Sequence, residues 1–363
     1  MPTLFDPIQL GAISAPNRII MAPLTRGRSE GVHVPITALK AEYYAQRAGA
    51  GLIIAEATGI SQQGLGWPSA PGIWSAEQVE AWKGVTEAVH EAGGRIVLQL
   101  WHMGRLVHSD YLNGQAPVSA SATTAPGQAH TVTGKKDYVA ARALRLDEIP
   151  ALIADYVQAS RNAITAGFDG VQLHGANGYL IDQFLRDNSN FRDDDYGGPI
   201  ENRIRLLREV TQAIADTVGA GRTSVRLSPN GDTQGCDDSN PIALFTAAAA
   251  ALDTIGIGFL ELREQKTFGL FGTSDVPRVS PDIRKVFSGP LVLNQEYRLA
   301  NASEDMASGL ADAISFGRTY IANPDLAQRL REDAELAPDN FRTWYSEGPE
   351  GYTDYPAMEH ANA

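Results

Sequence analysis

The sequence predicts an α/β fold in which eight strands and eight helices close into a (β/α)8 barrel, with residues 1–363 as a single domain. Two observations favour this fold: short apolar runs recur eight times, and a helical stretch follows each run. A third argues against the alternative, a doubly wound open sheet. No G-x-G-x-x-G phosphate fingerprint follows the first apolar run, as that sheet would require.

The apolar runs have the length and composition of strands buried on both faces of a parallel sheet. They are NRIIMAPLT at 17–25, GLIIAEAT at 51–58, RIVLQLWH at 95–102, GVQLHG at 170–175, TSVRLSP at 223–229, GFLELR at 258–263, PLVLNQ at 290–295 and ADAISFGR at 311–318.

The stretches between these runs carry helical periodicity and end signals. Ser75, followed by Glu77 and Gln78, resembles a capping box. Glycines such as Gly93 and Gly167 stand where helix C-caps favour a left-handed residue. The predicted helices span 35–48, 75–92, 146–166, 201–218, 241–254, 280–286, 300–308 and 323–331.

Three segments lie outside the repeating units. Residues 1–16 predict a hairpin that caps one end of the barrel. Residues 103–145 form a long polar loop after the third strand, and a loop of this length in a compact domain is usually functional. Residues 332–363 form a C-terminal tail with aromatic residues in its middle.

Composition excludes several classes of protein. A single cysteine, Cys236, rules out an internal disulfide framework, a cysteine-based zinc site and a cysteine-ligated iron–sulfur cluster. A formal charge of −13 disfavours nucleic acid and anionic membranes as partners. No signal peptide or membrane-spanning run is recognisable, so we expect a cytoplasmic protein, and a monomer.

The ends of the predicted strands carry the polar residues, and barrel enzymes place their chemistry there. A ring of hydrogen-bonding groups with few carboxylates suits a large polar heterocycle better than a metal, so we expect no metal site. Arg226, inside an apolar strand, needs an anionic or accepting partner, which a neighbouring acid could also supply. The strand-end residues are Pro23, Leu24, Thr25, Glu56, Ala57, Thr58, Gln99, Trp101, His102, His174, Asn177, Tyr179, Arg226, Ser228, Asn230, Asn294, Gln295, Gly317 and Arg318.

Several of these residues also have a purely structural interpretation. His174 alone could be a structural histidine, and Gln99 could satisfy a loop backbone. Trp67, Trp74 and Trp101 could all belong to the core. The pair Gly317-Arg318 matches the phosphate site that barrels often build after their last strands, but two residues are a weak signal.

In combination these segments resemble the old yellow enzyme family of FMN-dependent ene reductases, in particular the bacterial branch that reduces N-ethylmaleimide, cyclohexenones and nitrate esters. The resemblance covers nearly the whole chain. Its most specific parts are NRIIMAPLTR at 17–26, QLWHMGR at 99–105, HGANGYL at 174–180, FLRDNSNFRDDDYGG at 184–198, SVRLSP at 224–229 and SFGR at 315–318.

The resemblance implies non-covalent FMN as the cofactor and NADPH or NADH as the reductant. It implies that Arg226 stabilises negative charge on the reduced flavin, that Gln99 holds the pyrimidine edge, and that the Thr25 hydroxyl tunes the potential. The main chain of Pro23, Leu24 and Ala57 would frame the ring. Gly317 and Arg318 would hold the phosphate, together with Asn294 and Gln295.

The resemblance also implies a reaction. Hydride passes from flavin N5 to the β-carbon of an electron-poor alkene, as in the reduction of xenobiotic enones, and nitrate esters are a further substrate class. His174 and Asn177 donate hydrogen bonds to the substrate oxygen, and Tyr179 supplies a proton to the α-carbon. The residues expected to line the substrate side are Trp67, Trp101, Gln234, Phe268, Phe271 and Tyr352.

The sequence departs from the family pattern at three places. Asn177 stands where part of the family has a second histidine, and Trp67 stands where many relatives have tyrosine. At strand seven, LNQEY replaces a glycine-rich turn, so phosphate binding there would use Asn294 or Gln295 with Glu296 pointing away.

Other functions fit the residues less well. A hydrolase or aldolase barrel would need a metal set or a Schiff-base lysine at a strand end, and the eight predicted strand ends carry no lysine. A barrel that oxidises a hydroxy acid would use a late His–Arg pair. The remaining alternative is a non-catalytic flavin-binding barrel, which would have no reason to keep Tyr179.

Overall fold

The computed structural model describes residues 2–264 and 274–358. Eight parallel strands close into a barrel in the order in which they occur along the chain, and β16 pairs with β3 to complete the circle through Ile314 opposite Ile19. All eight predicted strands are confirmed. They are β3 (Ile19–Met21), β6 (Leu52–Gly59), β7 (Ile96–Trp101), β12 (Gly170–Gly175), β13 (Thr223–Leu227), β14 (Phe259–Arg263), β15 (Leu291–Asn294) and β16 (Ala313–Phe316).

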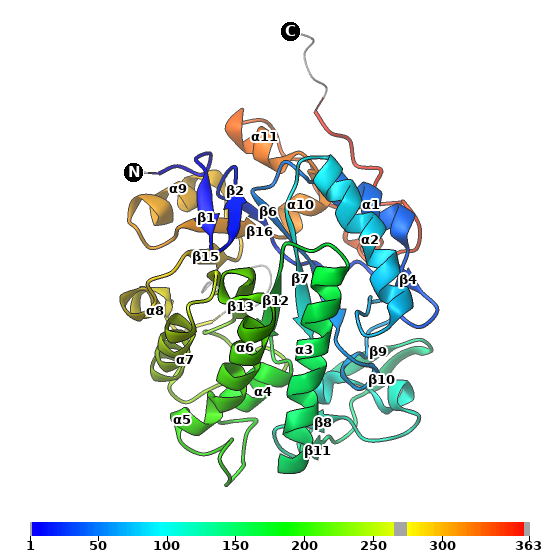
Figure 1. Cartoon of the computed structure of the whole chain (residues 1–363), viewed down its shortest axis with the longest axis vertical. Coiled ribbons are helices and arrows are strands. Elements are labelled where there is room, and N and C mark those ends of the chain that lie inside the picture. The colour runs from blue at the N-terminus through cyan, green and yellow to red at the C-terminus, as the bar shows by residue number, and fades with distance from the viewer. Residues whose placement is uncertain (1, 265–273, 359–363) are drawn as a thin grey trace.

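Helices surround the barrel, as a (β/α)8 fold requires (Figure 1). The predicted capping box exists: Ser75 accepts from the amide of Gln78, and the Gln78 side chain accepts from the amide of Ser75. The principal helices are α1 (Thr37–Ala45), α2 (Ala76–Glu91), α3 (Ile149–Thr165), α5 (Ile200–Arg203), α6 (Arg205–Val218), α7 (Pro241–Ile255), α8 (Ser280–Val286), α9 (Leu299–Ala307) and α11 (Leu326–Arg331).

Three details differ from the predicted helices. The stretch 201–218 is two helices, α5 and α6, with a break at Ile204. Two short helices, α4 (Leu180–Leu185) and α10 (Arg318–Ala322), were not predicted because each directly follows a strand-end motif whose composition is that of a loop.

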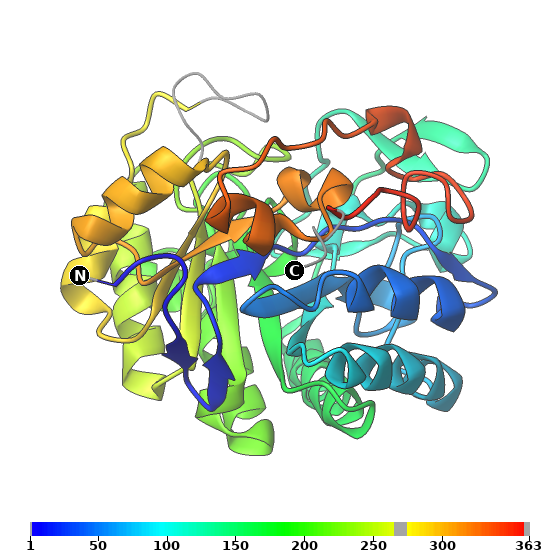
Figure 2. The same ribbon diagram turned by 90° about the horizontal axis from the view of Figure 1, so that it is seen from above.

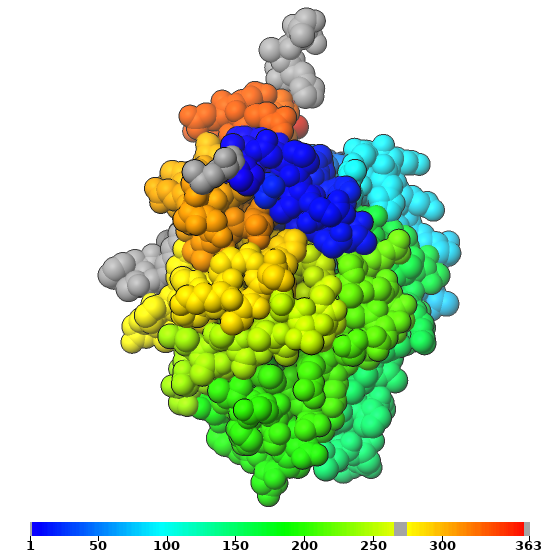
Figure 3. Space-filling model, turned by 60° about the vertical axis from the view of Figure 1, so that its left-hand side comes forward, coloured from blue at the N-terminus to red at the C-terminus, as the bar shows by residue number. Residues whose placement is uncertain are grey.

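The N-terminal hairpin, β1 (Ile8–Leu10) and β2 (Ile13–Ala15), closes the N-terminal end of the barrel, as predicted. Its Leu10 and Ile13 pack in one apolar cluster with barrel residues such as Ile54 and Phe259. The amide of Ala12 donates to the carbonyl of Gly221 at 2.8 Å, which fixes the hairpin tip. In the space-filling view the blue N-terminal segment lies directly against the later barrel units (Figure 3).

The segment 103–145 is more structured than a plain polar loop. It holds the hairpin of β9 (Gln128–Thr131) and β10 (Gly134–Asp137), and the parallel pair β8 (Val118–Ser119) and β11 (Arg142–Ala143). A further short antiparallel pair, β4 (Ser29–Glu30) and β5 (Val34–Pro35), precedes α1. Figure 2 shows the segment 103–145 and the red C-terminal tail together on one side of the molecule.

Across the described part of the chain, no helix is long and apolar enough to cross a bilayer.

Candidate active site

A cavity of about 1280 Å³ opens at the C-terminal ends of the barrel strands. Every strand-end residue that was predicted to bind a cofactor lies in its wall, together with the residues predicted to act on the substrate oxygen and α-carbon. These are Pro23, Leu24, Thr25, Ala57, Gln99, Trp101, His174, Asn177, Tyr179, Arg226, Asn294, Gln295, Gly317 and Arg318. The fold therefore brings into one cavity residues that are spread over nearly 300 positions of sequence.

A buried polar layer inside the barrel supports the cavity floor. Gln99 Nε2 donates to Gln172 Oε1 at 2.8 Å, and Gln172 Nε2 donates to Glu261 Oε2 at 3.0 Å. Ser315 Oγ donates to the other oxygen of the Glu261 carboxylate at 2.6 Å. Buried polar groups that are hydrogen-bonded in this way hold one another in fixed rotamers, so this layer orients Gln99.

Arg226 has both a neutral hydrogen-bond acceptor and an acidic side chain as partners. Its Nη2 donates to Asn294 Oδ1 at 2.8 Å, and its Nε lies 3.6 Å from Glu261 Oε2, which is an ion pair without a hydrogen bond. Among the described residues, Arg226 Nε and the indole Nε1 of Trp101 are buried without a hydrogen-bond partner. Both residues line the cavity, so their unpartnered N–H groups can donate hydrogen bonds to a bound ligand.

His174 at the end of β12 is a neutral hydrogen-bond donor. Burial, together with the charges of Arg226 and Arg263, lowers the pKa of His174 well below its ordinary value. The amide of Ala176 lies 3.4 Å from His174 Nδ1 and points its N–H at it. Because Nδ1 accepts this bond, the ring proton belongs on Nε2, which can donate to a ligand.

Tyr179 packs edge-on against two other rings of the cavity wall. Its ring centroid lies 5.0 Å from that of Trp101 and 4.8 Å from that of His174, with interplanar angles of 85° and 81°. Burial raises the pKa of the Tyr179 phenol above its ordinary value. The hydroxyl is therefore protonated at neutral pH and held in a fixed position.

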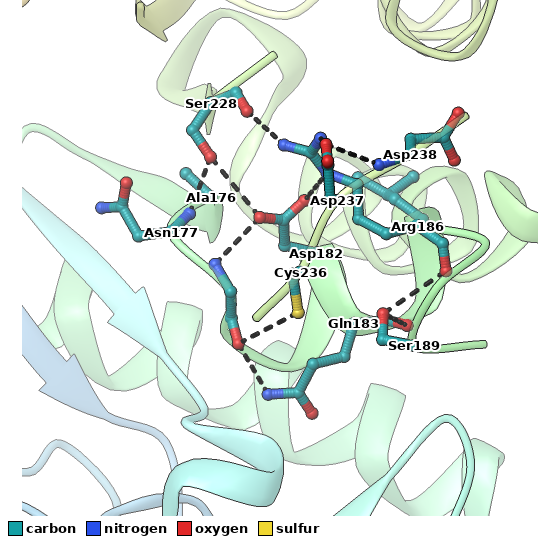
Figure 4. A network of polar contacts seen from close by, with 12 residues as sticks. Ala176, Asn177, Asp182, Gln183, Arg186, Ser189, Ser228, Cys236, Asp237 and Asp238 are labelled. Carbon is teal, nitrogen blue, oxygen red and sulfur yellow. Dashed lines mark hydrogen bonds and ion pairs between the residues drawn. The ribbon is translucent and has the colours of Figure 1, made fainter. Parts of the chain in front are cut away.

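The loop that carries Asn177 is anchored by a network of polar and charged side chains (Figure 4). Asn177 has a left-handed backbone, φ 60°, which asparagine tolerates better than most residues. Its amide donates to Ser228 Oγ at 2.8 Å, and the amide of Gly178 donates to Asp182 Oδ2 at 2.9 Å. Arg186 Nε donates to the other Asp182 oxygen at 2.9 Å, so α4 fixes the geometry of the loop before it.

The expected phosphate corner is built from the turns after β15 and β16. Arg318 Nε donates to Asp339 Oδ1 at 2.7 Å, and its guanidinium lies 5.5 Å from the Trp344 ring. The turn after β15 has left-handed backbone at Gln295, φ 109°, and Glu296, φ 54°. This conformation favours glycine, which neither residue is.

The expectation that Glu296 points away from a bound phosphate stays a prediction. Glu296 is half-buried and contributes to the cavity wall, and its negative charge opposes the lowering of the Arg263 pKa that burial and Arg226 cause. Its carboxylate therefore offsets part of the positive charge that Arg226 and Arg263 bring to the site.

Three of the residues expected on the substrate side lie elsewhere. Tyr352 is fully buried and stacks on Tyr43 at 4.0 Å, beneath Arg28, so it belongs to the core. Trp67 packs between His130 and the cavity residue Tyr345 and is not itself part of the cavity wall, and Gln234 is exposed at the surface.

Phe268 and Phe271 lie outside the described residues. Trp344 and Tyr345 from the tail line the cavity instead of Tyr352. The run of aromatic residues in the tail was the signal for them, but it could not show which rings face inward.

Arg263, at the end of β14, is a cavity residue that sequence reasoning missed. The signal for it is its place at the end of the sixth predicted strand, GFLELR at 258–263. Burial and the nearby charge of Arg226 lower the pKa of Arg263 to about 10, so its guanidinium remains protonated at neutral pH.

The described residues contain no cluster of three or more histidine, cysteine or acidic side chains arranged to hold a metal ion.

Similar proteins of known structure share the whole fold. An old yellow enzyme homologue from Zymomonas mobilis is 60% identical, with a TM-score of 0.97 over 98% of this chain and 100% of that one. Morphinone reductase in complex with tetrahydroNAD is 42% identical, with a TM-score of 0.94 over 100% of this chain and 99% of that one. Among curated proteins, 12-oxophytodienoate reductase 1 of Oryza sativa subsp. japonica is 42% identical over 98% of this chain and 93% of its own length.

The residues of the cavity fit an FMN molecule. The unpartnered donors Arg226 Nε and Trp101 Nε1 can meet acceptors on a bound ligand, and Gln99 can meet the edge of a heterocycle. The turn at Gly317 and Arg318 lies in the same cavity and can receive a phosphate. A volume of about 1280 Å³ leaves room for a second molecule above the ring.

A family model described as NADH:flavin oxidoreductase / NADH oxidase matches residues 3–337, most of the chain. The barrel, the flavin-sized cavity and the relatives agree with this match. The protein is an oxidoreductase whose cofactor is FMN and whose reductant is a nicotinamide nucleotide. The chain belongs to the NADH:flavin oxidoreductase / NADH oxidase family, and its structural relatives include old yellow enzyme homologues.

Proposed function

We propose that this protein reduces the activated C=C bond of α,β-unsaturated carbonyl and nitro compounds, with NADPH or NADH as the reductant. FMN, when bound, supplies the hydride chemistry that links the nicotinamide to the alkene. The protein supplies binding, orientation, charge stabilisation and a proton.

Arg226 and Gln99 are the proposed partners of the flavin. Arg226 is a fixed cation in a barrel interior from which water is largely excluded, so it stabilises negative charge strongly. The Gln99 amide is held by Gln172 and therefore meets the ligand without reorganising. The Thr25 hydroxyl, with the main chain of Pro23, Leu24 and Ala57, completes this wall of the cavity.

His174 and Asn177 are the proposed donors to the carbonyl or nitro oxygen of the substrate. Neutral His174 donates through Nε2, and Asn177 donates through its side-chain N–H group. Both stabilise the enolate-like charge that develops on this oxygen in the transition state.

Tyr179 is the proposed proton donor to the α-carbon of the substrate. Its phenol is protonated at neutral pH because burial raises its pKa, and its position is fixed by packing against Trp101 and His174. Positioned general acids of this kind contribute about 10²–10⁴-fold to rate.

One observation carries the proposal: two hydrogen-bond donors and a protonated phenol lie together in the wall of a flavin-sized cavity. The test is incubation of the purified protein with NADPH and 2-cyclohexenone. We expect cyclohexanone in an amount equal to the coenzyme consumed. Coenzyme oxidation without any saturated ketone, under exclusion of oxygen, would contradict the proposal.

The same donors suit the oxygens of a nitrate ester, and we propose these compounds as a further substrate class, tested by nitrite release. A flavin-binding barrel without ene reductase activity is the alternative, and it predicts no ketone in the assay above.

A cytoplasmic location and a monomeric state complete the proposal. The single cysteine agrees with a reducing compartment, and light scattering measures the mass in solution.

A further inference from the structure

Arg263 occupies a position that the proposed reaction leaves without a role. It ends β14, and its side chain reaches the part of the cavity wall that holds His174 and Asn177. Its guanidinium carries a charge at neutral pH, in a site that already contains the cation of Arg226. A second cation in such a site is costly, so its contacts require an explanation.

The contacts of Arg263 include two side-chain carbonyl oxygens. Its Nη1 donates to Asn177 Oδ1 at 2.9 Å, and its Nε donates to Gln295 Oε1 at 3.0 Å. A guanidinium can only donate hydrogen bonds, so it distinguishes the two ends of a carboxamide. The Asn177 oxygen therefore faces Arg263, and its N–H group is left to face elsewhere.

The main chain of Asn177 is fixed as well. Its amide is bonded to Ser228 Oγ, and Ser228 and Gly178 both contact the Asp182 carboxylate (Figure 4). With the backbone held by these bonds, the main freedom left to this residue is rotation of its side chain. Arg263 is the described residue whose charge removes that freedom.

We propose that Arg263 is a positioning residue, which orients the Asn177 carboxamide so that its N–H group, and not its oxygen, meets the substrate oxygen. The inference rests on the proposed ene reductase function. An amide turned the other way would set oxygen against oxygen, which is repulsive. The cation also polarises the amide, and a polarised amide is a stronger hydrogen-bond donor.

The proposal explains why asparagine can replace the histidine found in part of the family. A neutral imidazole has one donor and one acceptor nitrogen, and a backbone amide can set its direction, as the Ala176 amide does for His174, whereas the oxygen of a carboxamide is turned most strongly by a cation. Asparagine needs such a partner, and the end of β14 provides it.

The test is a double-mutant cycle on reoxidation of the reduced protein by 2-cyclohexenone, a substrate without charge. The cycle uses the parent protein, Arg263→Met, Asn177→Ala and the double variant. Chemical reduction with dithionite before mixing keeps coenzyme binding out of the measurement. We expect Arg263→Met to slow reoxidation about 10- to 100-fold, as for loss of a charge-assisted hydrogen bond.

In the Asn177→Ala background, the same Arg263→Met change is expected to alter the rate less than about twofold, because the group through which Arg263 acts is gone. Arg263→Lys, which keeps a charged donor, is expected to recover part of the loss. Arg145→Met, which removes an exposed arginine from the surface, is the matched control for loss of one charge.

Equal slowing by Arg263→Met in both backgrounds, with no recovery in Arg263→Lys, would overturn the proposal. Flavin content, measured by absorbance, shows whether each variant still binds its cofactor. A parent protein that binds FMN but is not reoxidised by any enone would instead defeat the proposed function, and the inference with it.

Discussion

The two ends of the barrel are built from the same eight strands, yet they are filled with opposite chemistry. At the N-terminal end, Ile20, Ile54, Val97 and Val292 meet the hairpin residues Leu10 and Ile13 in one apolar cluster. At the C-terminal end, buried Gln99, Gln172, Arg226, Glu261 and Ser315 form a hydrogen-bonded polar layer under an open cavity.

The difference shows how one barrel separates stability from chemistry. Burial of apolar side chains at the hairpin end stabilises the fold without any directional requirement. The polar layer is costly to bury unless its groups are hydrogen-bonded, and the unpartnered Nε of Arg226 still lacks an acceptor that a ligand can supply. Variants at the two ends should therefore change different measurable quantities.

The largest expected effect is at Arg226. Arg226→Met should abolish FMN binding, seen as loss of the flavin absorbance after purification, because the fixed cation in the cavity is gone. It also leaves the buried Glu261 carboxylate without its ion-pair partner, which destabilises the protein. The double variant Arg226→Met/Glu261→Gln separates the two effects: it should regain stability but not FMN. Recovery of flavin in the double variant would refute the assigned role of Arg226.

Next in size is the effect at Tyr179. Tyr179→Phe should keep FMN and its reduction by NADPH, yet slow turnover of weakly activated enones by about 10²–10⁴-fold, because the proton donor is missing. Strongly activated nitroalkenes should lose less, since their nitronate is stable enough to take a proton from water. Stopped-flow reoxidation with both substrate types measures this. Equal rates for parent and variant across all substrates would remove Tyr179 from the mechanism.

At the opposite end of the barrel, Ile54→Ala should lower the free energy of unfolding by about 2–5 kcal/mol, because it leaves a cavity in a fully packed cluster. Turnover per bound FMN should be unchanged at temperatures where the variant is folded. Denaturant unfolding followed by circular dichroism measures the first quantity. A variant of normal stability with altered turnover would contradict the separation of the two ends.

The smallest expected effect comes from the carboxylate inside the polar layer. Glu261→Gln keeps the hydrogen-bonding shape but removes a negative charge that lies 3.6 Å from Arg226. Arg226 should then favour the reduced flavin more strongly and raise its potential by about 30 mV, the value for a tenfold change in a two-electron equilibrium. Spectroelectrochemical titration gives this number, and a lowered potential would show that Glu261 acts in the opposite sense.

Sequence reasoning predicted the barrel well because each of its strands is a short apolar run, and each run is bounded by helical segments. The same rule placed His174, Asn177, Tyr179 and Arg226 at one end of the barrel, since parallel strands all end on the same side. The N-terminal cap was predictable for a similar reason, because its local hairpin pattern is contained in residues 1–16.

The site features that the sequence did not predict depend on contacts between distant segments. Whether Tyr352 or Tyr345 faces the cavity is decided by the path of the tail over Tyr43, Arg26 and Arg28, and no local pattern encodes that path. The partner of Asn177 is Arg263, which is 86 residues away in the sequence. The left-handed turn at Gln295 and Glu296 was also not predictable from the sequence, because neither residue type favours a positive φ.

The most direct test of the whole account is one anaerobic absorption experiment on the purified protein. The account predicts a yellow protein that bleaches when NADPH or NADH is added and recovers its colour when 2-cyclohexenone follows. A protein that binds FMN and bleaches, but stays colourless with every activated alkene offered, would contradict the proposed reaction. A protein that cannot be loaded with FMN would contradict the assignment of the cavity itself.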